Sequence, residues 1–326
     1  KRILEMNHNS KIYVAGHNGL AGSAILYNLK EAGFKNIIVK SHDELDLTDQ
    51  LVTSNFFKTE KPEYVFLAAG KVGGIYANTL FPADFIYQNI AIQSNVIHQS
   101  YLQGVKRLLF LGSSCIYPRD CKQPIKEEYI LSGPLEKSNS PYALAKISGI
   151  EMCSSYNRQY KTKYLAAMPT NLYGPGDNYD LQSGHVIAAL IRKFAEATKS
   201  NTESIEVWGS GKPKREFLCS TDLAEACVFL MNLVDEKFNS LLKNDLSENL
   251  YPIINVGAGE DISIKDLSLL IAKISGFKGQ VIFDNTKLDG TPRKLLNVDV
   301  LTKLGWTPKI SISDGIKKAL QDFSYS

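Results

Sequence analysis

A tyrosine and a lysine stand four residues apart near the middle of the chain, at Tyr142 and Lys146. In a helix, residues at this spacing share one face, so a phenol and an ammonium would lie side by side. A neighbouring ammonium stabilises a phenolate and lowers the pKa of the tyrosine towards the working range. The pair is therefore suited to giving a proton to a carbonyl oxygen while a hydride reaches the carbonyl carbon.

Two serines support this interpretation. Ser113 and Ser114 close the apolar segment 107–114, which is typical of a buried strand. Open α/β sheets bind ligands outside the carboxyl ends of their strands, where a serine hydroxyl can bond the same carbonyl oxygen. The four-residue spacing alone often arises by chance, but Ser113, Tyr142 and Lys146 together predict a reductase.

Three glycines, Gly16, Gly19 and Gly22, follow the first apolar segment at 11–15 and open a helical pattern. Such glycines let the chain turn sharply from strand to helix and let a pyrophosphate approach the backbone. The start of the helix then supplies N–H donors and partial positive charge. A purely structural turn is the alternative, but the order of strand, turn and helix predicts a dinucleotide site.

The residues after the second expected strand, at 36–40, bear on which dinucleotide binds. NAD sites usually place an acidic residue there to bond the ribose 2′-hydroxyl. This chain instead has Lys40, Ser41 and His42, and a cation beside a hydroxyl suits a 2′-phosphate. The alternative is that Lys40 is merely a solvated charge, and the acidic residues Asp43 and Glu44 follow closely. The balance favours NADP(H).

These residues require a scaffold, and the first half of the chain alternates short apolar segments with helical patterns. Such alternation predicts a doubly wound parallel sheet of the Rossmann type, covered by helices on both faces. We expect strands at 11–15, 36–40, 64–69, 107–114 and 164–170, with helices ending at Ala32 and covering 50–59, 85–101 and 141–160.

The pattern changes after Thr170, where the segment 171–185 is rich in Gly, Asn, Asp and Pro and reads as a loop. We expect a smaller mixed lobe beyond it. The predicted division is a cofactor domain at 10–170 and a mainly substrate-binding lobe at 171–326, from which some segments return to the first domain. Expected elements are helices at 185–199, 221–233, 264–275 and 311–322 and strands at 204–208, 253–256 and 280–284.

Composition excludes several other classes of protein. The 326 residues are 44% hydrophobic and carry a net charge of +3, far from the clustered basic excess of a nucleic-acid binder. Apolar segments stay short of the length that spans a bilayer. The five scattered cysteines favour neither a disulfide framework nor a metal site. We expect a cytoplasmic enzyme without metal, membrane or nucleic acid.

The chain resembles the extended short-chain dehydrogenase/reductase family, and within it the branch of GDP-L-fucose synthases. The resemblance spans nearly the whole chain. It rests on the segments AGHNGLAGSA (15–24), AAGKVGGIYAN (68–78), PADFIYQN (82–89), LGSSCIYP (111–118), PYALAKISGIE (141–151), MPTNLYGPGDN (168–178), SGHVIAALIRKF (183–194), VWGSGKPKREFL (207–218) and DGTPRKLL (289–296).

The resemblance implies roles for matching residues. Ser113, Tyr142 and Lys146 correspond to the reductase triad, and Cys115 and His185 to a pair that epimerises sugar carbons 3 and 5. A thiol and an imidazole can both titrate near neutral pH. The implied cofactor contacts are Gly16, Gly19, Leu20, Gly22, Lys40, Ser41, His42, Ala68, Ala69 and Lys146, and the implied substrate contacts are Asn171, Lys193, Trp208, Arg215 and Lys294.

The resemblance thus implies an NADPH-dependent homodimer that reduces, and also epimerises, a GDP-linked 4-keto-6-deoxy sugar. One alternative is a reductase for another GDP sugar, such as a 6-deoxyheptose, with little or no epimerase activity. It is permitted because Lys193 and Cys219 differ from the residues usual in the family. A remote alternative is an NADP-binding protein without catalysis, which would not need a proton donor.

Overall fold

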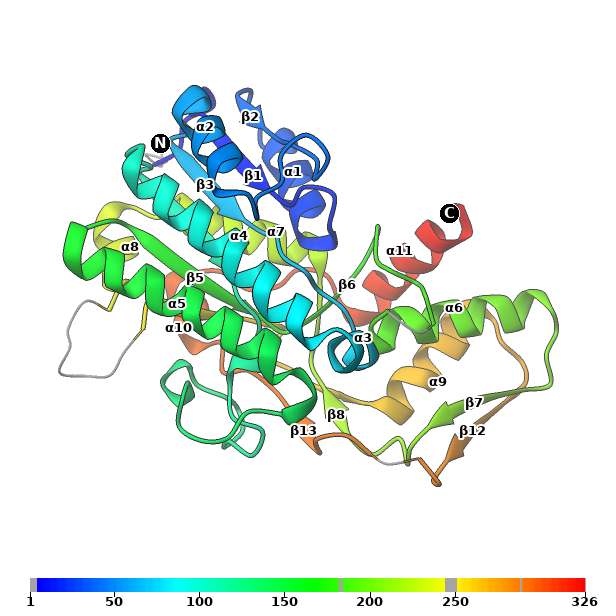
Figure 1. Cartoon of the computed structure of the whole chain (residues 1–326). Helices are drawn as coiled ribbons and strands as arrows, with labels where there is room; N and C mark the ends of the chain where they lie inside the picture. Colours follow the sequence, from blue (N-terminus) through cyan, green and yellow to red (C-terminus); the bar gives the residue numbers. More distant parts are fainter. Residues whose placement is uncertain (1–4, 182–183, 244–250, 288, 326) are drawn as a thin grey trace.

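The computed structural model describes residues 5–181, 184–243, 251–287 and 289–325. Its centre is a six-stranded parallel sheet in the order β10-β5-β4-β3-β1-β2 (Figure 1). The bounds are β1 (Ile12–Ala15), β2 (Ile37–Ile38), β3 (Tyr64–Leu67), β4 (Arg107–Leu111), β5 (Tyr164–Pro169) and β10 (Ile253–Val256).

Helices cover both faces of this sheet because successive strand side chains point to opposite sides. In β1, Ile12 and Val14 belong to the core under α1 (Leu20–Glu31) and α7 (Ser220–Met231). Tyr13 and Ala15 belong to the opposite core. That second core lies under α2 (Gln50–Glu60), α4 (Pro82–Leu102) and α5 (Ser140–Tyr160).

A smaller lobe has its own core, built on α6 (Val186–Lys199), α9 (Ile264–Ser275) and α11 (Ile312–Tyr325). Three small sheets surround it. They comprise β6 (Asn171–Tyr173) with β9 (Phe217–Cys219), β7 (Ser204–Trp208) with β12 (Gln280–Asp284), and β8 (Lys214–Arg215) with β11 (Ile262–Ser263) and β13 (Arg293–Lys294). Short helices α3 (Ile75–Leu80), α8 (Asp235–Ser240) and α10 (Asp299–Leu304) complete the chain.

The parallel Rossmann-type sheet expected from the sequence is confirmed, with several differences in detail. The second strand is only Ile37–Ile38, and the fourth ends at Leu111 rather than continuing through Ser114. Residues 114–116 form a short 3-10 helix that turns the chain at the sheet edge. Two later segments, β10 and α7, return to the first domain, because β10 pairs with β5 and α7 packs on α1.

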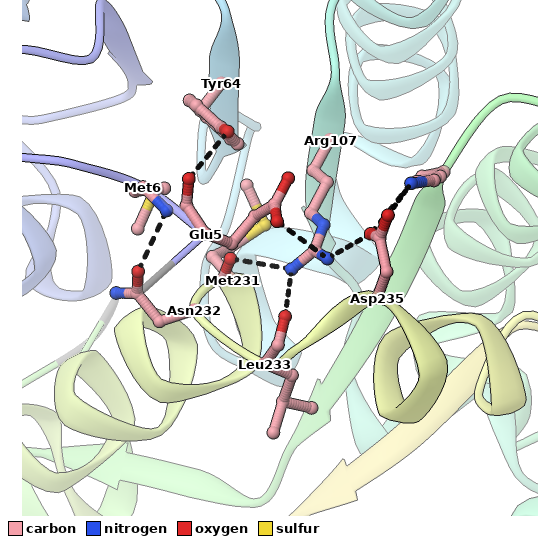
Figure 2. Close-up of polar contacts among 9 residues, drawn as sticks. Glu5, Met6, Tyr64, Arg107, Met231, Asn232, Leu233 and Asp235 are labelled. Carbon is pink, nitrogen blue, oxygen red and sulfur yellow. Dashed lines mark hydrogen bonds and ion pairs between the residues drawn. The ribbon is translucent and has the colours of Figure 1, made fainter. Parts of the chain in front are cut away.

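The amino-terminal edge of the sheet is held by a buried arginine, which Figure 2 shows. The guanidinium of Arg107 donates to the carbonyls of Met231 (3.0 Å) and Leu233 (2.6 Å) and to the Asp235 carboxylate (2.6 Å). Glu5 lies 3.7 Å from the same group. Because a guanidinium carries its donors in a fixed fork, it joins β4 to the end of α7 and the start of α8.

Within the described residues, no helix is long and apolar enough to cross a membrane. The same part of the chain contains no group of three or more His, Cys, Asp or Glu that could hold a metal ion. All five cysteines are free thiols.

Candidate active site

Four of the expected site segments lie where parallel strands end. Gly16 follows β1, Ala68 and Ala69 follow β3, Ser113 follows β4, and Asn171 follows β5. The carboxyl ends of parallel strands meet at one edge of a sheet, and ligands of open α/β folds bind outside that edge. The topology therefore brings these segments to a common site.

Helix α5 carries Tyr142 and Lys146 beside this edge. The Lys146 ammonium donates to the carbonyl oxygen of Leu111 at 2.8 Å. It lies 5.7 Å from the ring centroid of Tyr142 and 4.8 Å from that of Phe110. Tyr142 itself packs edge-on against Phe85, with ring centroids 6.2 Å apart. Lys146 is thus anchored to the end of β4 and placed against the phenol.

Burial governs the pKa values of this pair. It lowers the pKa of Lys146 to about 8, because an ammonium loses its hydration. It also raises the pKa of Tyr142, and nearby Cys115 raises it further. In this structure burial therefore sets the direction of the phenol pKa, which is raised and not lowered as the sequence suggested. A protonated phenol is the form that can donate a proton.

Ser113 and Cys115 share one short turn. Ser113 precedes the 3-10 helix at 114–116, and its hydroxyl oxygen accepts from the Cys115 backbone N–H at 3.3 Å. Burial raises the pKa of the Cys115 thiol, while Lys294, Ser113 and Lys146 act to lower it. Two cations thus favour the thiolate at a site that burial otherwise keeps neutral.

His185 lies at the start of α6, in the smaller lobe. Its side chain is exposed, yet the surrounding protein lowers its pKa by desolvation. The neutral imidazole is therefore favoured near neutral pH, and this form can accept a proton.

The glycine turn is shaped for close approach. Gly16 has a φ of +83°, and a Cβ there would lie 2.6 Å from the backbone of Ala69. A Cβ at Gly22 would collide with the Gly16 carbonyl. Gly19 begins α1 without a side-chain cap, and Leu20 opens a first turn that holds no acidic residue. The start of α1 therefore offers its N–H groups and positive end to an anion, which fits a dinucleotide pyrophosphate.

Two of the residues that we expect to bind the 2′-phosphate contact a carboxylate in this structure. Glu44 accepts from the Ser41 N–H (2.8 Å), the Ser41 hydroxyl (2.9 Å) and the Lys40 ammonium (3.3 Å). His42 is exposed and lies 3.9 Å from the Asp46 carboxylate. The Ser41 and Lys40 donors hold the Glu44 pKa at about 2. These donors thus suit a small anion at this position.

Two cations of the smaller lobe lie side by side. Arg215 on β8 and Lys294 on β13 are register partners in a parallel pair, so their side chains share one face. The Arg215 guanidinium donates to the carbonyls of Lys214 (2.8 Å) and Thr291 (2.6 Å). Burial lowers the pKa of both side chains, and Arg215 lowers that of Lys294 further. Paired cations of this kind attract a diphosphate.

The other expected substrate residues have distinct surroundings. Asn171 donates its side-chain amide to the Glu216 carbonyl at 2.8 Å. The Lys193 ammonium donates to the Glu206 carbonyl at 2.8 Å, which joins α6 to β7. Trp208 is 70% exposed at the end of β7, which rules out core packing, and the Lys287 ammonium lies 5.5 Å from its ring centroid.

Sequence reasoning passed over Glu216, which is fully buried between Arg215 and Phe217. An acidic residue followed by the apolar segment 217–219 is unusual, because carboxylates are rarely buried without hydrogen-bond donors. An acidic residue directly before an apolar segment was therefore the sequence signal that could have drawn attention to Glu216.

Comparison with known proteins places this geometry in a family. Residues 12–244 match the model of the NAD dependent epimerase/dehydratase family. The chain is 50% identical to a putative GDP-L-fucose synthase 2 of Arabidopsis thaliana, over 97% of this chain and 92% of the relative. It is 49% identical to the GDP-L-fucose synthase of Escherichia coli K12, over 96% of each chain.

A solved structure agrees with these relatives. A GDP-D-glycero-L-gluco-heptose synthase from Campylobacter jejuni, in the presence of NADPH, superimposes with a TM-score of 0.90 at 40% identity. The match covers 98% of this chain and 100% of the other. The chain therefore belongs to the NAD dependent epimerase/dehydratase family, with GDP-L-fucose synthases among its near relatives.

Proposed function

We propose that this protein is an NADPH-dependent reductase of a GDP-linked 4-keto-6-deoxy sugar that also epimerises carbons 3 and 5, as GDP-L-fucose synthases do. The observation that carries the proposal is the placement of Tyr142 and Lys146 against the end of β4, where Ser113 and Cys115 also lie. Relatives at 49–50% identity are named GDP-L-fucose synthases.

The cofactor proposal rests on the glycine turn and the cationic segment after β2. Gly16, Gly19, Leu20 and Gly22 would hold the pyrophosphate, and Lys40, Ser41 and His42 the 2′-phosphate, with Ala68 and Ala69 beside the turn. NADPH supplies the hydride for such a reduction. The NADPH in the related Campylobacter structure supports this choice.

Reduction needs one proton at the carbonyl oxygen. Tyr142 is the donor, because burial keeps its phenol protonated. Lys146 is fixed to the Leu111 carbonyl and places positive charge beside the phenol, which stabilises the phenolate that remains after transfer. The Ser113 hydroxyl orients the carbonyl oxygen. The three residues act as one proton-donating unit.

Epimerisation needs a base and an acid, because a ketone at carbon 4 acidifies the hydrogens on carbons 3 and 5. Cys115 and His185 take these roles in the proposal. Burial raises the pKa of Cys115, and Lys294 and Lys146 act against that rise. The lowered pKa of His185 favours its neutral form. Each group can then take up and return a proton.

The nucleotide proposal rests on the smaller lobe. Arg215 and Lys294 present adjacent positive charges that suit a diphosphate. Asn171, Lys193 and Trp208 complete the proposed substrate contacts. Accordingly, we assign residues 10–170 to cofactor binding and 171–326 mainly to substrate binding, with β10 and α7 as the segments that return.

We also propose that the protein acts in the cytoplasm as a homodimer. Helices α4 and α5 carry exposed apolar side chains, including Tyr87 (69% exposed), Ile90 (38%) and Leu144 (47%). Apolar groups of this kind gain free energy when a second copy covers them. Light scattering on the protein as it elutes from a size-exclusion column tests the dimer, and a monomer at micromolar concentration would contradict it.

A GDP-heptose reductase is the second candidate, and one observation favours it. The heptose synthase from Campylobacter jejuni matches nearly the whole chain. NADPH oxidation with GDP-4-keto-6-deoxymannose and with a GDP-4-keto-6-deoxyheptose decides between the two. We expect faster turnover of the mannose-derived ketone. Preference for the heptose would select the second candidate.

Tyr142→Phe is the matched control in that assay. It removes the proton donor and keeps the ring, so turnover should fall by at least about a hundredfold with little change in NADPH affinity. Near-full turnover would exclude Tyr142 as the donor. If the wild-type protein binds NADPH but oxidises none with any GDP keto sugar, a non-catalytic NADP-binding role would follow.

A further inference from the structure

Glu216 carries a buried carboxylate that lies between segments of the two lobes. Its side chain is 0% exposed. Oε1 accepts from the Gly259 N–H at 2.8 Å, and Oε2 accepts from the Leu296 N–H at 3.0 Å. Both oxygens therefore accept hydrogen bonds from backbone donors. Burial raises the pKa of this carboxyl, and the N–H groups of Leu296 and Gly259 act to lower it.

The backbone of Glu216 adds further connections. Its carbonyl accepts from the Asn171 side-chain amide (2.8 Å) and the Thr170 hydroxyl (3.3 Å). Its N–H donates to the Lys294 carbonyl at 3.3 Å. One residue thus joins the end of β5, the loop after β10 and the segment that follows β13.

The fit around this carboxylate is close. A Cβ at Gly257 would collide with the carboxylate oxygens of Glu216. The loop after β10 therefore approaches the side chain as bare backbone. A carboxylate surrounded so closely by backbone has little freedom to move, so it fixes the segments that it contacts.

These connections flank the two cations of the smaller lobe. Arg215 immediately precedes Glu216, and Lys294 lies two residues before Leu296, whose N–H the carboxylate holds. Arg215 and Lys294 are register partners, and their like charges repel. Side chains that repel keep a common orientation only when their backbones are held in register.

We propose that Glu216 is a positioning residue, which keeps Arg215 and Lys294 side by side so that they bind the diphosphate of the nucleotide together. The inference rests on the proposed function, because it presumes a nucleoside diphosphate at these two cations. Glu216 touches backbone groups and acts through its neighbours.

Glu216→Gln tests the proposal. The substitution keeps the size of the side chain but turns one acceptor into an NH₂ donor, which faces a backbone N–H and has to move. We expect the Kd of GDP, measured by calorimetry, to rise at least about tenfold. The Kd of NADPH should stay within about twofold, because the cofactor residues lie in the other domain.

Glu127→Gln is the matched control. Glu127 is a half-buried carboxylate that accepts from the Asn255 N–H on β10 at 3.0 Å. Glutamine keeps one acceptor oxygen for this N–H and removes the charge, and we expect GDP affinity to stay unchanged. If both variants weaken GDP binding equally, Glu216 has only a structural role and the proposal fails.

A double-mutant cycle with Arg215→Met separates positioning from general damage. If Glu216 acts through Arg215, Glu216→Gln should weaken GDP binding by no more than about threefold in the Arg215→Met background. An undiminished effect would overturn the proposal. Should Glu216→Gln not fold, Glu216→Asp keeps the charge but shortens its reach, and equal GDP affinity in that variant would also overturn it. A wild-type protein that does not bind GDP would instead contradict the proposed function.

Discussion

Asp177 makes stability depend on pH in an unusual direction. It lies on the loop between β6 and α6, which also leads to His185. Its Oδ1 accepts from the Asn178 N–H at 2.7 Å, whereas its Oδ2 is buried and has no hydrogen-bond partner among the described residues. Burial first, and then the nearby Asp322 of α11, raise the pKa of Asp177 to about 6.

The sign follows from proton binding. The unfolded chain has an Asp pKa of about 3.9, so between that value and about 6 the folded state binds more protons than the unfolded state. Stability therefore falls as pH rises through this window and is constant above it. From about pH 5 to about pH 7.5 the two pKa values imply a loss of about 1.4 kcal/mol. Partial exposure reduces this to about 1 kcal/mol.

Asp177→Asn removes the titrating group. We expect the free energy of unfolding, measured with urea, to fall by about 1 kcal/mol more in the wild type than in Asp177→Asn across that pH range. Asp43→Asn, which removes an exposed aspartate in the other domain, is the matched control. Equal pH slopes in the wild type and Asp177→Asn would refute the reasoning.

Three further predictions concern the site. Cys115→Ser should slow solvent exchange at carbons 3 and 5 at least about tenfold while sparing reduction of a ketone that needs no inversion, and an unchanged product mixture would exclude this role. Lys294→Met should raise the pH at which epimerisation becomes half-maximal, because the ammonium acts to lower the Cys115 pKa; an unshifted pH profile would show that it does not tune the thiol. Glu44→Gln should tighten NADPH relative to NADH by about threefold or more, because the carboxylate now occupies Ser41 and Lys40, and an unchanged ratio of Kd values would mean that Glu44 does not compete with the 2′-phosphate.

Much of the scaffold follows from local pattern. Apolar segments such as 64–69 and 107–114 alternate with helical segments, and burial on both faces leaves a parallel sheet as the solution. The pairing of β10 with the first domain was harder to predict, because the residues at 253–256 do not indicate which strand is their partner. Pairing with β5 is a long-range contact that neither propensity nor periodicity encodes.

The site divides in a similar way. Tyr142, Lys146 and Ser113 could be proposed from the sequence because their chemistry is visible in residue type and spacing. The effect of burial on Tyr142 was not, since desolvation depends on the packing of many distant residues. Glu216 was missed because its carboxylate contacts backbone N–H groups, and such contacts cannot be recognised from residue types. Likewise, nothing in the sequence indicated that Lys193 would donate to the backbone of β7.

The proposed reaction can be measured by incubating the protein with NADPH and GDP-4-keto-6-deoxymannose in deuterated water and identifying the product by NMR. We expect NADPH oxidation and GDP-L-fucose that carries deuterium at carbons 3 and 5. Oxidation without deuterium at these carbons would contradict the epimerase half of the claim, and absence of oxidation would contradict the assignment of this substrate.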